Sequence, residues 1–458
     1  MRATKFLMGV IALFCLMMCG SCQRSSVTED GLRKGREEVV FWHFWGGKDG
    51  EVVDEVVDAF NRSQDRYFVR AIAMPGNNLD TKLFLSIAGG DPPDLVNQDD
   101  PIVADWAHRG IIEAFDSFVE ADELKAAKTQ MLPAANRLGE YDSRTYAIAN
   151  GLDIRALLYN KTFLDSEGYQ VPETLEEFNA ICEKISAPGN EARERYAYLP
   201  DSRRLWSWAY VFGGKFIDDQ SGEAELSGDA VLAAARWMQS FGDKYGSDNV
   251  AAFRQGDQSL PGKTFPLLPI NDEDAYGRYV FILAGQWNTR DVGEFQKARK
   301  KKGIPFPEFG VCPLPYPSGG RPNAGWVNGN VFVVPKGAAN KPGAWEFVKF
   351  WIGIENAKAA AKTCAAGGWI PVTTNVLETR EFQTHLKSNP LFGRYVELAQ
   401  SENQFTYPLV PAAPFFVRTL NAVNESLMAD PQKDVEEELA KAERKIRRQL
   451  KQVREQYQ

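Results

Sequence analysis

The chain has 458 residues, a formal net charge of −8 at pH 7, and ordinary contents of hydrophobic (44%) and charged (25%) residues. At about 150 residues per domain, this length predicts two or three domains in a globular protein. The acidic balance argues against nucleic acid as the main partner, because a nucleic-acid-binding surface is basic. The 11 tryptophans suit either a large core or flat sugar rings, and composition does not separate these roles.

The first 22 residues have the pattern of an export signal. A positively charged start leads into an apolar run over 6–18, which is too short to span a bilayer comfortably, and small residues then precede Cys22. The segment resembles a bacterial lipoprotein signal, although Cys19 stands where that pattern usually has leucine. We expect an exported protein that is lipid-anchored through Cys22, with 23–35 as a tether. Simple secretory cleavage is the alternative.

Few residues in the mature chain suggest covalent or metal chemistry. Beyond Cys22, the cysteines are Cys182, Cys312 and Cys364, an odd number with long spacings and no metal-like pairing. One disulfide is possible, but a disulfide framework is not. The three histidines lie far apart, and neither GxSxG nor GxGxxG occurs. We therefore expect no cofactor and no metal.

The N-terminal part alternates short apolar runs with helical patterns. The expected elements, in order, are a strand over 38–45, a helix over 49–63, a strand over 67–74, a helix over 79–88 and a strand over 95–97. This rhythm predicts a mostly parallel sheet with helices on both faces. Ligands bind beyond the carboxyl ends of such strands, which places Trp42, Phe44, Trp45 and the loop Gln98-Asp99-Asp100 at a candidate site.

The stretch 146–161 reads as a strand with an unusual pair of charges. One face is apolar, while Asp153 and Arg155 lie two residues apart on the other face. Buried charge is costly unless it is paired or turned towards water or a ligand. A structural ion pair at a strand end is one interpretation. The other is a strand that crosses between two lobes, with Asp153 and Arg155 facing a polar ligand.

The remaining elements follow from periodicity and turn signals. They are a helix after the N-cap Thr174 with Glu177 in a capping box, a helix over 226–241, a loop-rich stretch over 254–278, a strand over 279–287 that presents Trp287, a strand and Pro/Gly linker from 309, a strand over 326–335, a helix over 341–351, and a long helix from 434. The last helix has one apolar face, which indicates docking on a lobe more than a coiled-coil partner.

Several ordered motifs together carry a family likeness. They are FWHFWGG (41–47), AGGDPPDLV (88–96), GLDIRALLYNK (151–161), AGQW (284–287) and GWVNGNVFVVPKG (325–337). The chain resembles the extracellular solute-binding proteins of bacterial ABC transporters, of the maltose-binding-like, carbohydrate type. The likeness covers essentially all of the mature chain.

This resemblance implies an α/β, two-lobed periplasmic binding protein fold of type 2, with the ligand cleft between the lobes. The chain would cross between lobes three times, near 149–151, 318–325 and 371–375. The implied lobes are residues 36–149 with 325–372 for lobe one, and 150–324 with 373–458 for lobe two.

The resemblance also implies a set of solute-binding residues. Asp153 would accept hydrogen bonds from sugar hydroxyls, and Trp287 would stack on a sugar ring. The full set is Trp45, Gly46, Asp99, Asp153, Arg155, Asp201, Trp206, Trp287, Asn328, Asn330 and Phe416. Core packing is the alternative role for the tryptophans. The stretch 97–100 is polar where sugar binders commonly have an aromatic residue, so the solute can differ from malto-oligosaccharides.

The function expected from this likeness is capture of a mono- or oligosaccharide by a monomeric, non-enzymatic, membrane-anchored protein, which delivers the solute to an ABC permease. Three alternatives stay open. The solute can be of the glycerol-3-phosphate type, held by Arg155, Arg203, Arg204 or Arg290. The protein can be a sensor subunit. It can also be a secreted carbohydrate-active enzyme that uses Asp153 and a second carboxylate.

Overall fold

The computed structural model describes residues 33–74, 78–186, 195–218, 221–260, 265–269, 271–273 and 276–456. The expected signal, its Cys22 and most of the tether lie outside the described residues. Within the described ranges, no helix combines the length and apolar character needed to cross a membrane.

The first lobe is built on three parallel strands, as the N-terminal rhythm predicts. Strand β1 (Glu37–His43) lies between β2 (Tyr67–Ala73) and β3 (Leu95–Asp99), and helices α3 (Gly47–Ser63) and α4 (Leu79–Gly89) connect them. The fully buried Phe41 of β1 packs its ring against Phe332 and Phe347, at centroid distances of 5.6 and 5.4 Å. The alternate inward residues of β1 thus form the centre of this core.

Short elements lead from β3 to the strand that joins the lobes. They are η1 (Asp100–Ile102), α5 (Val103–His108), β4 (Ile112–Glu113), η2 (Phe115–Ser117), α6 (Ala121–Gln130), α7 (Pro133–Gly139), β5 (Glu140–Tyr141) and β6 (Arg144–Thr145).

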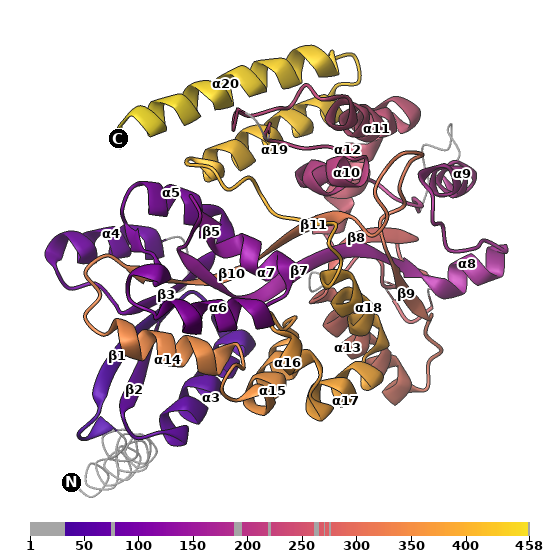
Figure 1. Cartoon of the computed structure of the whole chain (residues 1–458). Helices are drawn as coiled ribbons and strands as arrows, with labels where there is room; N and C mark the ends of the chain where they lie inside the picture. The colour runs from indigo at the N-terminus through magenta and orange to yellow at the C-terminus, as the bar shows by residue number, and fades with distance from the viewer. Residues whose placement is uncertain are drawn as a thin grey trace, which may run out of the picture.

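Strand β7 (Ala147–Asn160) belongs to both lobes. Its residues 147–154 pair antiparallel with β10 (Gly325–Pro335), while 155–159 pair with β8 (Phe281–Gly285) and 157–160 pair with β9 (Phe309–Cys312). The strand order is β2-β1-β3-β10-β7-β8. Figure 1 shows β7 running from the first lobe into the second, where β8 and β9 lie. One strand therefore changes partners in its middle.

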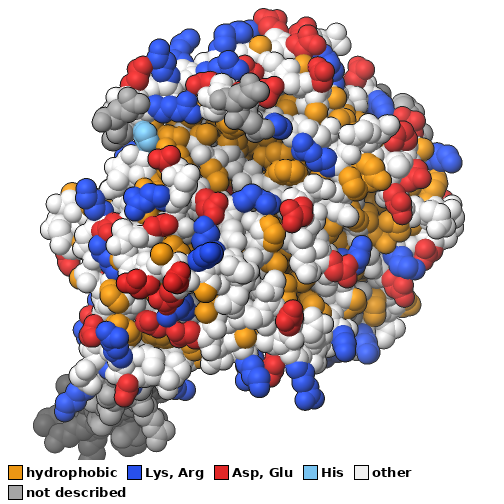
Figure 2. Space-filling view, in the orientation of Figure 1, with side chains coloured by type: hydrophobic (Ala, Val, Ile, Leu, Met, Phe, Trp, Pro, Cys, Tyr) orange, Lys and Arg blue, Asp and Glu red, His pale blue; other side chains and the backbone are white. Residues whose placement is uncertain are grey.

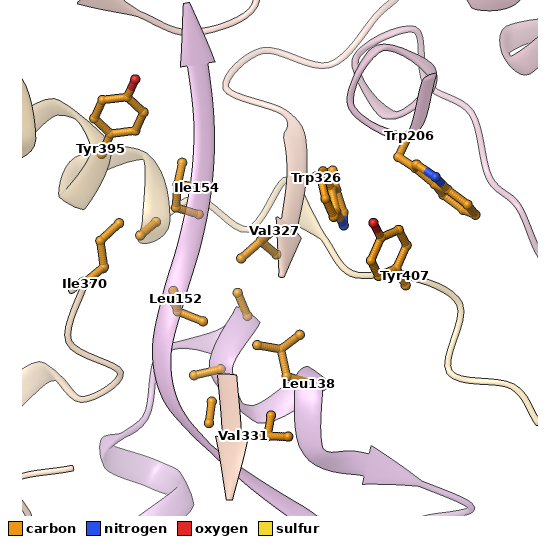
Figure 3. Packing of buried hydrophobic residues seen from close by; sticks show 14 of the residues in the cluster. Leu138, Leu152, Ile154, Trp206, Trp326, Val327, Val331, Ile370, Tyr395 and Tyr407 are labelled. Atoms are coloured by element: carbon orange, nitrogen blue, oxygen red, sulfur yellow. The ribbon is translucent and has the colours of Figure 1, made fainter. Parts of the chain in front are cut away.

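The packing around β7 is close where β10 runs beside it. Leu152 and Ile154 are fully buried, and Figure 3 shows them on the β7 strand beside Ile370. A Cβ atom on Gly329 would lie 2.3 Å from the carbonyl oxygen of Gly151, so the two backbones meet without room for a side chain. The two strands thus pack as one unit at this point.

The second lobe carries most of its helices between β7 and β9. They are α8 (Lys161–Glu167), α9 (Leu175–Ile185), η3 (Ser202–Arg204), α10 (Leu205–Val211), α11 (Asp229–Tyr245), α12 (Ser247–Gln258) and α13 (Asn288–Lys302). The capping box of Thr174 and Glu177 is confirmed.

The second lobe also corrects the sequence analysis in two places. Helix α12 extends to Gln258, so the loop-rich interpretation of 254–278 is wrong at its start. Helix α13 was not anticipated, because it is mostly polar and buries only Val292 and Arg299. An amphipathic stripe is the main sequence signal for a helix, and α13 has almost none.

The C-terminal part is helical apart from β11 (Gln404–Phe405). It contains α14 (Lys341–Trp351), α15 (Ala357–Gly367), α16 (Thr374–Leu377), α17 (Arg380–Ser388), α18 (Pro390–Ala399), α19 (Ala413–Ala429) and α20 (Val435–Gln456). Helix α20 lies along α19 at the top of Figure 1 and buries its whole apolar stripe, as predicted. Figure 2 shows basic and acidic side chains over its outer side.

The three cysteines of the mature chain are free and buried. Burial raises the pKa of the Cys312 thiol and of the Cys364 thiol to about 12, and raises that of Cys182 as well. These thiols are therefore protonated at neutral pH and act as small apolar groups.

Truncation of the apolar stripe of α20 tests its docking. Leu450 is 1% exposed, so Leu450→Ala should lower the free energy of unfolding by about 2–5 kcal/mol through lost burial and a cavity. The neighbouring Lys451 is exposed, and Lys451→Ala should change it by less than about 0.5 kcal/mol. Urea unfolding measures both, and equal effects would show that α20 does not contribute to the core.

Candidate functional site

Polar side chains gather where β3, β7 and β10 lie side by side. In the strand register, Asn328 of β10 lies opposite Asp153 of β7, and Asn330 lies opposite Asp99 at the end of β3. The amide of Asn330 donates to Asp99 Oδ1 at 2.7 Å. Three of the expected site residues on two separate strands thus converge on the carboxyl end of β3, as the parallel-sheet argument predicts.

Asp153 is held in place by Gln286, a residue that the sequence analysis did not single out. The Gln286 amide donates to Asp153 Oδ1 (2.9 Å) and to the Leu152 carbonyl (3.1 Å), and its oxygen accepts from the Ile154 amide (3.0 Å). The Gln286 side chain therefore forms hydrogen bonds with three successive residues of β7, as a neighbouring strand would. Its place beside Trp287 in the AGQW motif was the only available signal.

Arg155 lies between two tryptophans and is 7% exposed. Its guanidinium carbon is 4.7 Å from the ring centre of Trp287 and 4.5 Å from that of Trp326, and Nη1 donates to Asn328 Oδ1 at 2.5 Å. Burial lowers the pKa of Arg155 to about 10, so the group remains a cation at pH 7. Trp287, in contrast, is 38% exposed and offers apolar surface to solvent.

Two neighbouring aspartates at the end of β3 have opposite exposure. Solvent reaches Asp99, but the protein atoms around it remove much of its hydration, and with nearby Asp153 they raise its pKa to about 6. Asp100 is buried, accepts from the Gly329 amide at 3.2 Å, and has a pKa raised well above its usual range by burial. Asp100 is therefore an enclosed structural residue, and Asp99 is the carboxylate that faces outward.

The loop after β1 approaches the site from the first lobe. Trp45 is 9% exposed and stacks on Trp351 and Trp369, at centroid distances of 5.8 and 5.3 Å. Gly46 is exposed and caps the beginning of α3. Little of the Trp45 ring is therefore free for a solute, whereas the backbone at Gly46 is open.

Two ion pairs join the beginning of α3 to α13, the helix that follows Trp287. Lys48 Nζ is 3.4 Å from Glu294 Oε1, and Arg290 Nη1 is 3.5 Å from Asp49 Oδ1. The loop after β1 and the turn at Trp287 are therefore brought close to each other by contacts between α3 and α13.

The remaining candidates are engaged within the protein. Trp206 and Phe416 are fully buried and pack on each other at 5.6 Å, so core packing, the alternative role, describes both in this structure. Figure 3 shows Tyr407 beside both Trp206 and Trp326, whose rings it contacts. Both carboxylate oxygens of Asp201 accept hydrogen bonds from the Arg203 side chain.

The arginines proposed for an anionic solute are engaged within the protein. Arg203 binds Asp201, Arg290 binds Asp49, and Arg204 covers the Trp326 ring at 5.4 Å. Arg155 is enclosed as described. No group of metal-ligating side chains suited to an ion occurs among the described residues. The outward-facing groups are carboxylate and amide oxygens beside one indole, which can accept hydroxyl hydrogens and stack on a flat apolar face.

The fold and this site define a two-lobed α/β binding protein with a polar and aromatic site at the strands that join the lobes. The sequence profile of a family described as bacterial extracellular solute-binding protein matches residues 55–390, well over half of the chain. The chain therefore belongs to the bacterial extracellular solute-binding proteins.

Individual relatives agree with this assignment. A maltotriose-binding protein of Pyrococcus abyssi (strain GE5 / Orsay) is 24% identical over 431 residues, which cover 90% of this chain and 82% of that protein. The structure of the sugar-binding protein MalE from Xanthomonas citri matches with a TM-score of 0.71 at 20% identity, covering 91% of this chain and 98% of that one. A cyclic α-maltosyl-1,6-maltose binding protein from Arthrobacter globiformis matches with a TM-score of 0.70 at 21% identity, covering 91% and 100%. All three are named as binding proteins, and the two structures share the two-lobed fold.

The raised pKa of Asp99 predicts a pH dependence of stability. The folded state holds the Asp99 proton more tightly than the unfolded state, so this group favours folding below pH 4, and that contribution is lost as the pH rises to about 6. Asp99→Asn removes the titration, and the gain at pH 7 should be about 1 kcal/mol or less, because solvent screens the exposed carboxylate.

Thermal unfolding from pH 4 to pH 7 tests this expectation. The difference between Asp99→Asn and the wild type should grow as the pH rises through about 6. The exposed Asp58→Asn variant should show no such trend. A constant difference would show that Asp99 has an ordinary pKa.

Proposed function

We propose that this protein captures a neutral sugar, a mono- or oligosaccharide, between its two lobes. The observation that carries the proposal is the exposed Trp287 indole, which directly follows Gln286, the residue that holds the Asp153 carboxylate. An aromatic face and hydrogen-bond acceptors at its edge match the apolar face and the hydroxyl rim of a pyranose ring. The internal engagement of the arginines favours a neutral solute over the glycerol-3-phosphate type. The names of the relatives, which bind maltotriose and a cyclic maltosyl maltose, support the same class.

The lobe boundaries that we propose are 36–149 with 325–372 for lobe one, and 150–324 with 373–458 for lobe two. The change of partners along β7 supports the first crossing, and the step from β9 to β10 supports the second. The bridges of Ile370 to Leu152 and of Thr373 to Met131 support a third crossing beside the first. Closure would be a rotation about these crossings, and the solute would favour the closed form because both lobes contact it.

We further propose that the protein is exported, lipid-anchored through Cys22 at the periplasmic or outer cell surface, and passes its solute as a monomer to an ABC permease. Family membership and the signal-like N-terminus support this proposal. It is a binding protein without catalytic activity of its own. A neighbouring permease gene would favour transport, and a neighbouring histidine kinase gene would favour the sensor alternative.

A thermal-shift screen of the chain from Gln23, with mono-, oligo- and cyclic saccharides and glycerol phosphates, tests the proposed solute. A sugar at a hundred times its Kd stabilises by about 2.7 kcal/mol, which corresponds to roughly 5–10 °C. Trp287→Ala and Asp153→Asn should remove most of the shift. The exposed Leu85→Ala and Asp58→Asn variants should keep it.

The outcomes of this screen separate the alternatives. A shift with glycerol phosphates alone would contradict the neutral-sugar proposal, and so would no shift with any compound. Chromatography of the incubated sugars should show no cleavage product, and release of product would identify an enzyme.

The ion pairs between α3 and α13 predict how charge affects solute release. Arg290→Asp places two carboxylates opposite each other at Asp49, so the closed form is weakened and the release rate should rise about twofold to fivefold. The exchanged pair, Asp49→Arg with Arg290→Asp, should restore the wild-type rate at low salt. Stopped-flow tryptophan fluorescence measures the release, and equal rates in the reversed and exchanged variants would show that the pair does not act in closure.

A further inference from the structure

We propose that Arg155 is a positioning residue, which fixes the plane of the Trp287 indole by stacking against it and does not itself bind the solute. This inference deepens the proposed function, on which it rests for the role of Trp287 as the solute platform. It also changes the role that the family likeness gave to Arg155.

Arg155 is the second member of a stack of four side chains, which we call the Arg–Trp stack: Trp287, Arg155, Trp326 and Arg204. The guanidinium carbon of Arg155 lies 4.7 Å from the Trp287 ring centre and 4.5 Å from that of Trp326, and Arg204 lies 5.4 Å from the Trp326 ring centre. The four residues come from four separate segments: the turn after β8, β7, β10 and η3. Figure 3 shows the inner end of this stack, with Trp326 beside Tyr407.

The surroundings of Arg155 leave almost none of it for a solute. Both faces of its guanidinium lie against indole rings, Nη1 donates to Asn328, and the residue is 7% exposed. Its Nε atom is buried and has no hydrogen-bond partner among the described residues. The charge persists at neutral pH, with Asp153 two residues away on the same strand as its nearest opposing charge. A buried cation held between two rings is a structural element of the site.

Trp287 also contacts a glycine at the end of β8. One edge of its ring lies on Gly285, where a Cβ atom would come within 2.3 Å of the ring, so only glycine leaves room for this placement. Gly285 lies opposite Arg155 in the β7–β8 register. The guanidinium and this glycine therefore both support the indole, of which 38% is exposed. An exposed side chain without them would exchange between rotamers.

The planar shape of arginine explains why this residue type suits the position. A guanidinium presents two flat faces to the two rings while its edge donates to Asn328. A lysine at this position keeps the charge but has no plane to stack, so Arg155→Lys separates the effect of charge from that of positioning.

Fluorine NMR of protein labelled with 5-fluorotryptophan tests the inference without any solute. Each of the 11 tryptophans gives a resonance, and its loss in Trp287→Phe identifies that of Trp287. Arg155→Lys should shift and broaden this resonance. Arg278→Lys removes another arginine that stacks on a ring, that of Phe253 at 3.9 Å, and should leave the Trp287 resonance unchanged. An unchanged Trp287 resonance in Arg155→Lys would overturn the inference.

A second variant covers the case in which Arg155→Lys does not fold. Asn328→Ala keeps the guanidinium but removes the acceptor that orients its edge. The Trp287 resonance should broaden in this variant as well, and an unchanged line in Asn328→Ala would count against the inference.

Calorimetry with maltotriose then distinguishes positioning from direct binding. Arg155→Lys should weaken maltotriose binding roughly tenfold in the wild-type background, and less than about twofold when Trp287 is already alanine. An equal loss in both backgrounds would show that Arg155 contacts the sugar directly. If the wild type binds no maltotriose, the proposed function fails for this sugar, and the fluorine measurement still decides the role of Arg155.

Discussion

The hydrogen-bonded ladder of β7 is the constraint on which both lobes depend. Residues 147–154 complete the sheet of the first lobe through β10, and residues 155–160 complete that of the second through β8 and β9. Buried backbone groups must be paired, so neither sheet can lose β7 without leaving a row of unsatisfied amides and carbonyls. The two lobes are therefore joined by shared structure as well as by chain connections. Motion between them is confined to bending and twisting of the joining strands.

The same constraint explains why charged residues occur in this strand. Asp153 and Arg155 flank the point where β7 leaves β10 and takes β8 as its partner. Asp153 is partly exposed there, and a charge that water reaches costs less than one in a closed core, whereas Arg155 is buried against two indole rings. Gln286 and Asn328 supply the hydrogen bonds that keep each charge in one orientation. The site thus arises from the joint between the lobes.

Features that depend on local periodicity could be predicted from the sequence. Features that depend on contacts between distant segments could not. The strand at β7, the capping box at Thr174 and the apolar stripe of α20 follow from spacing alone, and the structure has all three, although β7 is buried on both faces from Ile154 onward. Periodicity cannot tell a core tryptophan from a ligand platform, because both are large and apolar. Trp206 is enclosed by α19 and the chain near Tyr407, whereas Trp287 lies against a glycine and an arginine and is 38% exposed. The hydrogen bonds of Gln286 to β7 likewise form only when β8 lies beside that strand.

The ion pairs between α3 and α13 have a consequence for the alignment of the two lobes. The positive Lys48 pairs with Glu294, and the negative Asp49 pairs with Arg290. Arg290 and Glu294 lie one helical turn apart on α13. A slip of α13 by one turn would bring Lys48 opposite Arg290, or Asp49 opposite Glu294, and each such meeting is repulsive. The order of the four charges therefore favours a single alignment of the closing surfaces. Weak exposed pairs can supply this selectivity even though they add little to stability.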